Sequence, residues 1–86
     1  HSEAFMTTKL VLPKSGMGIE EGTIARWLKA EGDVVTRGEP VVEIETAKAV
    51  QEVEAPVSGT LVKILLAEGN TAAVNTEIAV IEEDHL

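Results

Sequence analysis

The side chain best suited to chemistry is the amine of Lys48, in the segment Thr46-Ala47-Lys48-Ala49. A lysine carries a primary amine on a long, flexible stem, which suits covalent attachment of a group that must reach outward. Apolar, β-branched runs flank this segment at residues 41–45 and 50–55, so Lys48 is expected at the tip of a hairpin. Taken alone, such a lysine is most often simply solvated.

The remaining polar residues do not form a pattern typical of catalysis or metal binding. The sequence has no cysteine, and its two histidines, His1 and His85, lie in the tails without ligand spacing. No nucleophile with a matching base, and no pair of acids at a useful spacing, is apparent. We therefore expect no metal site, no catalytic residues and no free-standing enzyme.

Length and composition narrow the function classes further. The chain has 86 residues, which is enough for one domain. Its net charge is −8 and its aromatic content is 2%, so it lacks both the basic surface and the stacking platforms of a nucleic-acid binder. No apolar run is long enough to span a membrane. An acidic surface favours an electropositive protein partner.

Short apolar runs separated by turn residues predict an all-β fold. We expect eight strands, at residues 10–12, 23–28, 34–36, 41–45, 50–55, 61–66, 71–73 and 78–81. No stretch is long and amphipathic enough to predict a helix.

The two halves of the chain resemble each other at an offset of 37 residues. Gly22-Thr23 aligns with Gly59-Thr60, and Ala30-Glu31-Gly32 aligns with Ala67-Glu68-Gly69. Units this short cannot bury their own apolar faces, so the two copies must pack together. This predicts a flattened barrel or sandwich of two four-stranded antiparallel sheets with pseudo-two-fold symmetry. Residues 15–21 have no counterpart in the second copy.

The hairpin register can be predicted if Ala47 and Lys48 form its loop. The expected pairs are then Thr46 with Ala49, Ile44 with Gln51 and Val42 with Val53. Glu43 and Glu52 become a like-charged pair on the solvent face, which should cost a few tenths of a kcal/mol or so. Nothing in the core requires that pair.

The segment Glu45-Thr46-Ala47-Lys48-Ala49 resembles the lipoyl-attachment motif of the 2-oxo acid dehydrogenase complexes. Val53, Gly59 and Leu61 stand five, eleven and thirteen residues after the lysine, as in the lipoyl pattern. Leu12-Pro13-Lys14, Met17-Gly18 and residues 27–35 are similar to the first half of such domains. The resemblance covers residues 8–82, and its motifs are highly specific when taken together.

This resemblance implies a lipoyl carrier domain over residues 6–82, with lipoate attached covalently to Lys48. It also implies recognition residues in the hairpin and in the loop before residue 22: Glu45, Thr46, Ala47, Ala49, Gly18, Glu20 and Glu21. The hairpin residues would label Lys48 for a lipoate ligase or lipoyl transferase. The loop would help a dehydrogenase recognise its carrier, although an ordinary surface loop is an equal alternative. Gly59 is expected to be an eighth recognition residue, which supplies a sharp turn that positions a neighbouring strand.

Three partner enzymes follow from the resemblance. A thiamine-dependent 2-oxo acid dehydrogenase would acylate the lipoyl group, an acyltransferase core would pass the acyl group to coenzyme A, and dihydrolipoyl dehydrogenase would reoxidise the arm. The domain itself is expected to be a monomer within a dihydrolipoyllysine acyltransferase. The substrate stays open among pyruvate, 2-oxoglutarate, branched-chain 2-oxo acids and acetoin.

One departure and several alternatives bear on this assignment. Most lipoyl domains have aspartate before the modified lysine, where this chain has Ala47. Biotinyl carriers flank their lysine with methionines, whereas Lys48 has alanines. The glycine-cleavage carrier is longer and has extra helical elements. An unmodified adaptor with the same sandwich would interrupt the Lys48 region with a long helical hairpin.

The ends of the chain also allow expectations. Residues 1–5 show no periodicity and precede Met6, so we interpret them as an expression remnant and Met6 as the native start. That start favours a bacterial cytoplasm over a mitochondrial matrix. Residues 83–86 are expected to begin a linker.

Overall fold

The structure, a computed structural model, describes residues 6–14 and 16–83. Eight strands form, as predicted, and the described residues contain no helix that could cross a membrane. The strands are β1 (Thr7–Val11), β2 (Glu21–Trp27), β3 (Val34–Val35), β4 (Pro40–Glu45), β5 (Val50–Glu54), β6 (Gly59–Ile64), β7 (Thr71–Ala73) and β8 (Glu77–Glu83).

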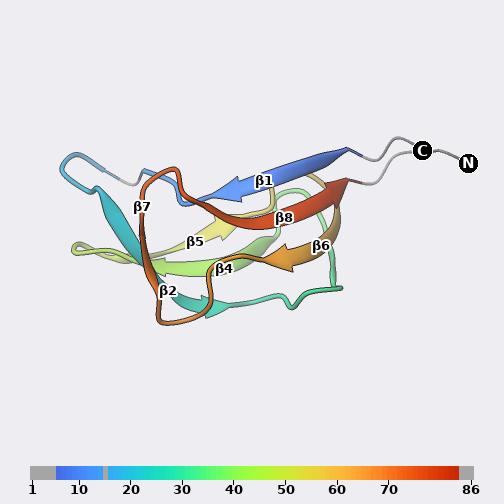
Figure 1. Cartoon of the computed structure of the whole chain (residues 1–86). Helices are drawn as coiled ribbons and strands as arrows, with labels where there is room; N and C mark the ends of the chain where they lie inside the picture. Colours follow the sequence, from blue (N-terminus) through green and yellow to red (C-terminus); the bar gives the residue numbers. More distant parts are fainter. Residues whose placement is uncertain (1–5, 15, 84–86) are drawn as a thin grey trace, which may run out of the picture.

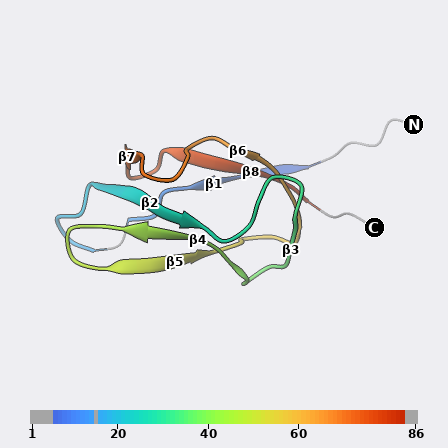
Figure 2. The ribbon, with the colours of Figure 1, turned by 90° about the horizontal axis from the view of Figure 1, so that it is seen from below.

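The strands form two antiparallel four-stranded sheets, ordered β1-β8-β6-β3 and β5-β4-β2-β7. Figure 2 shows the two layers, with β1, β6 and β8 in one and β2, β4 and β5 in the other. The turn between β4 and β5 lies at one end of the molecule, and the start of β1 and the end of β8 lie at the other (Figure 1). At that second end the Glu83 amide donates a hydrogen bond to the Met6 carbonyl, at 2.8 Å.

Most strands differ from the sequence expectation by one to three residues at one or both ends, and two of these differences concern the ends of the domain. Strand β1 begins at Thr7, three residues earlier than predicted, because its polar start pairs with the end of β8. Glu83, expected in a linker, is the last residue of β8. The proposed remnant, residues 1–5, and the rest of the proposed linker, residues 84–86, lie outside the described residues.

The strand registers confirm the internal duplication. Ile24 pairs with Ile44 between β2 and β4, and residues 37 positions later, Leu61 and Ile81, pair between β6 and β8. A register shift follows both Ile24 and Leu61. The two sheet orders are therefore equivalent strand by strand under a pseudo-two-fold axis.

The core lies between the two sheets and is entirely apolar among the described residues. It contains Leu10, Leu12, Ile24, Val35, Val41, Val42, Ile44, Ala55, Leu61, Ile78, Ala79 and Ile81. Both halves contribute, so neither copy has a complete core alone. Burial of these side chains supplies the main stabilising free energy.

Two glutamates from the repeated Ala-Glu-Gly turns join the halves. The Glu68 carboxylate accepts a hydrogen bond from the Trp27 amide at 3.0 Å, and the Glu31 carboxylate accepts one from the Ile64 amide at 2.8 Å. The 37-residue offset relates both donors and both acceptors. Each amide lies just beyond a bulge, where a regular ladder is interrupted.

We predict that Glu68→Ala lowers the free energy of unfolding by about 1 kcal/mol, because the Trp27 amide loses its protein acceptor. Glu68→Gln keeps an oxygen acceptor and should lose clearly less. Trp27 is the only tryptophan, so its fluorescence in a urea titration reports the change. Equal losses in the two variants would show that the hydrogen bond is not the cause.

Candidate functional site

Strands β4 and β5 form the hairpin that carries Lys48, in the predicted register. Ile44 pairs with Gln51, Val42 with Val53, and Glu43 with Glu52. Val42 and Ile44 are buried and Val53 is half-buried against the core. The apolar alternation therefore fixes which residues reach the tip.

Thr46 holds the turn at the tip. Its amide donates to the Ala49 carbonyl at 2.9 Å, and its hydroxyl donates to the same carbonyl at 3.2 Å. The hydroxyl also accepts from the Lys48 amide, at 3.3 Å. This hydroxyl takes the place of the Asn-Gly or Asp-Gly chemistry that usually closes a tight hairpin.

Lys48 is exposed at this tip, between the exposed Ala47 and Ala49. Its ammonium makes no ion pair or hydrogen bond with another residue in the described part of the chain. A fixed backbone and a free side chain are what covalent attachment of an arm requires, so this residue fits an amide-linked cofactor.

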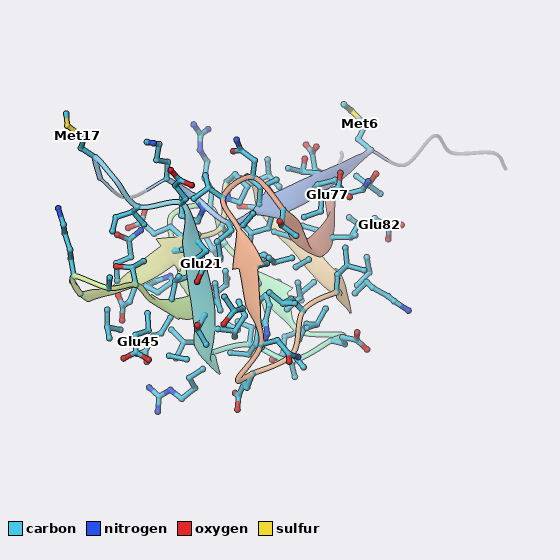
Figure 3. The ribbon with its side chains drawn as sticks, turned by 60° about the vertical axis from the view of Figure 1, so that its left-hand side comes forward. Met6, Met17, Glu21, Glu45, Glu77 and Glu82 are labelled. Atoms are coloured by element: carbon cyan, nitrogen blue, oxygen red, sulfur yellow. The ribbon has the colours of Figure 1, made fainter. Side chains whose placement is uncertain are left out.

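A hollow of about 540 Å³ lies beside the tip, between the β1–β2 loop and the hairpin. It is lined by Gly18, Ile19, Glu20, Glu21, Gly22, Thr23, Glu45, Thr46 and Ala47. Figure 3 shows Glu21 and Glu45 on neighbouring strands, with Met17 in the loop above them. Six of the eight predicted recognition residues therefore share one hollow. Ala49 and Gly59 do not line it.

The expectation for Gly59 was wrong in its physical reason. Gly59 is the first residue of β6 and has no left-handed backbone. A Cβ there would lie 2.0 Å from the Glu82 carbonyl oxygen, so glycine is required by the close approach of β8. Gly59 also lies at the end of the molecule opposite the β4–β5 turn (Figure 1).

Sequence reasoning did not select Ile19, Gly22 and Thr23, which also line the hollow. Gly22 is the repeat counterpart of Gly59, and a Cβ there would lie 2.8 Å from the Ile44 Cγ2. The repeated Gly-Thr pair was visible in the sequence. It could not show which of its two copies lies beside the lysine.

The outer face near the hairpin is acidic. The like-charged pair of Glu43 and Glu52 is present as predicted, and the Arg26 Nη2 approaches the Glu43 carboxylate at 3.4 Å. This exposed contact offsets little of the repulsion. Glu20, Glu21 and Glu45 are exposed around the hollow.

Comparison with known proteins identifies the family to which this chain belongs. The model of the biotin and lipoyl attachment family, described as "Biotin-requiring enzyme", matches residues 8–81. An acetyltransferase component of the pyruvate dehydrogenase complex from Rickettsia bellii is 48% identical, over 92% of this chain and 19% of its own. A succinyltransferase component of the 2-oxoglutarate dehydrogenase complex from the same organism is 45% identical, over 91% and 20%.

A third relative is a pyruvate dehydrogenase E1 component subunit beta from Rhizobium meliloti, 46% identical over 92% of this chain and 17% of its own. The chain thus spans a fifth or less of the length of these three relatives.

Two solved structures share the fold. A multi-domain long-chain acyl-CoA carboxylase superposes with a TM-score of 0.77 over 93% of this chain and 7% of its own, at 19% identity. The lipoyl domain of the 2-oxoglutarate dehydrogenase complex from Azotobacter vinelandii superposes with a TM-score of 0.64 at 33% identity, over 86% of this chain and 95% of its own. The chain therefore belongs to the biotin and lipoyl attachment family, as a lipoyl domain of the type found in 2-oxo acid dehydrogenase complexes.

Proposed function

We propose that this domain carries lipoate on Lys48 and moves acyl groups and electrons between the enzymes of a 2-oxo acid or acetoin dehydrogenase complex. The observation that carries the proposal is the exposed amine at the apex of a Thr46-fixed turn, without a protein partner among the described residues. An attachment enzyme can reach that amine without disturbing the sheets.

The choice of lipoate over biotin has two supports. The solved domain of 33% identity is a lipoyl domain, and the acyltransferase relatives are named for dihydrolipoyllysine. Ala47 and Ala49 flank the lysine, in place of the methionines of biotinyl carriers.

The chain itself determines the position of the lipoyl group and part of the length of the arm that carries it. The stem of Lys48 and an amide-linked lipoyl group together extend on the order of 14 Å, at ~1.2 Å per bond. Lipoate, when bound, supplies a dithiolane that can accept an acyl group and two electrons. The start of β1 and the end of β8 lie at the end of the molecule opposite the β4–β5 turn (Figure 1).

The partners belong to the same proposal. They are a thiamine-dependent dehydrogenase, an acyltransferase core, dihydrolipoyl dehydrogenase, and a lipoate ligase or lipoyl transferase. We place the domain in a dihydrolipoyllysine acyltransferase, as in the two Rickettsia relatives. The E1 subunit relative shows a similar segment in a dehydrogenase chain, so the next residues of the parent protein distinguish these two arrangements.

Moving the lysine to a different position along the hairpin tests this proposal. We predict that the double variant Lys48→Ala with Ala49→Lys is lipoylated at least tenfold more slowly than the native chain. The amine then leaves the tip one residue later, and successive residues point in different directions. The rate of adduct formation by intact-mass analysis measures the effect. Equal labelling of the shifted lysine would contradict a geometric role for the tip.

A further inference from the structure

The hollow beside Lys48 results from an asymmetry in an otherwise duplicated fold. The connection from β1 to β2 spans nine residues, 12–20, whereas the equivalent connection from β5 to β6 spans four, 55–58. The second copy shows that the sheets close without the extra residues. That extra length forms one wall of the hollow.

The lining of the hollow is partly apolar and leaves space for a ligand. Ile19, 6% exposed, is one of the lining residues, and Gly18, Gly22 and Ala47 contribute little or no side chain. The site of a Cβ on Gly18 has no heavy atom within 4 Å. The volume of about 540 Å³ lies within the usual range of small-molecule pockets.

The polar groups around the hollow disfavour an anionic ligand and can accept hydrogen bonds from a ligand that carries a donor. The exposed carboxylates of Glu20, Glu21 and Glu45 accept hydrogen bonds and repel anions. The hydroxyl of Thr46 is held by the turn, and that of Thr23 is 2.6 Å from the Thr71 hydroxyl. A phosphate or a free carboxylate therefore fits poorly.

We infer that this hollow is a resting site for the arm on Lys48, a neutral and mostly apolar chain linked by an amide. The identity of the arm rests on the proposed function. Ala47 lines the hollow and precedes Lys48, so the arm leaves the chain at the edge of the site.

Attachment makes docking intramolecular, with an effective concentration of roughly millimolar or more. Burial of each methylene favours the docked arm by roughly fourfold, before the cost of ordering it. A shallow site can therefore hold the arm between transfers and release it to a partner.

The two alanines beside Lys48 provide a matched pair for the test. Ala47→Leu adds bulk at a residue that lines the hollow, whereas Ala49→Leu adds the same bulk at a residue that does not line it. Amide chemical shifts are compared between unmodified and lipoylated protein, with mass analysis confirming one adduct on Lys48. We expect lipoylation to shift the amides of Gly18, Ile19 and Gly22 in the native chain and in Ala49→Leu, and to leave them unchanged in Ala47→Leu.

Shifts confined to residues 46–50 in the native chain would overturn the inference, as would equal shifts in both variants. Failure of enzymatic lipoylation would count against the proposed function alone. The resting site is then tested on Lys48→Cys alkylated with N-octyl iodoacetamide, which attaches a neutral arm at the only thiol in the chain. The same amides should shift, and shifts limited to the turn would again reject the site.

Discussion

Lys48→Arg is expected to abolish lipoylation and every transfer that depends on it. Arginine keeps the positive charge and a long stem, but its guanidinium stays protonated and is a poor nucleophile. The loss should be complete within detection, because Lys48 is the lysine displayed at the hairpin tip. Intact-mass analysis after incubation with a lipoate ligase, followed by an acylation assay with a 2-oxo acid dehydrogenase, measures both effects.

The fold should be unaffected by the same substitution. Lys48 is exposed and has no ion-pair partner among residues 6–14 and 16–83, so the free energy of unfolding should change by less than about 0.5 kcal/mol. Lys63→Arg, at an exposed position in β6, is the control and should be modified normally. Residual adduct on Lys48→Arg would mean that another lysine is the attachment residue.

Gly59→Ala is expected to produce the largest loss of stability among single substitutions considered for this chain. The new Cβ would lie 2.0 Å from the Glu82 carbonyl oxygen and 2.9 Å from the Glu83 Cα, both backbone atoms of β8. Relief requires movement of paired strands, so we expect a loss of about 3 kcal/mol or more. An 86-residue domain has roughly 4–13 kcal/mol in total.

Gly22→Ala provides the comparison at the equivalent position of the first copy. There the nearest atom is the Ile44 Cγ2 at 2.8 Å, a side-chain atom that can shift. Thermal unfolding of both variants measures the effect. The loss of stability in Gly22→Ala should be smaller than that in Gly59→Ala. A loss of 3 kcal/mol corresponds to a decrease in Tm of roughly 12–24 °C. A Gly59→Ala protein as stable as Gly22→Ala would refute the close-approach account.

The sequence predicted those features that depend on local pattern. The alternation of Val42, Ile44 and Val53 constrained the hairpin register, because a one-residue slip would turn Val53 away from the core. The repeated Gly-Thr and Ala-Glu-Gly segments predicted two equivalent sheets, and the paired bulges after Ile24 and Leu61 confirm them.

Features that depend on tertiary packing were not predictable in the same way. The sequence shows Gly22 and Gly59 as equivalent, and only the pairing of β6 with β8 places Gly59 far from Lys48. The hollow forms because a loop before β2 folds against the hairpin, a contact between segments about 25 residues apart. The turn role of the Thr46 hydroxyl was likewise visible only in its hydrogen bonds.

The most direct measurement is fragment mass analysis of the native chain after separate incubation with a lipoate ligase and a biotin ligase. The chain has five lysines, at positions 9, 14, 29, 48 and 63, so the modified one can be assigned unambiguously. A single lipoyl group on the lysine at the bend, with little or no biotin, is the result expected from this geometry. Lipoyl groups on any other lysine, or efficient biotin attachment in its place, would contradict it.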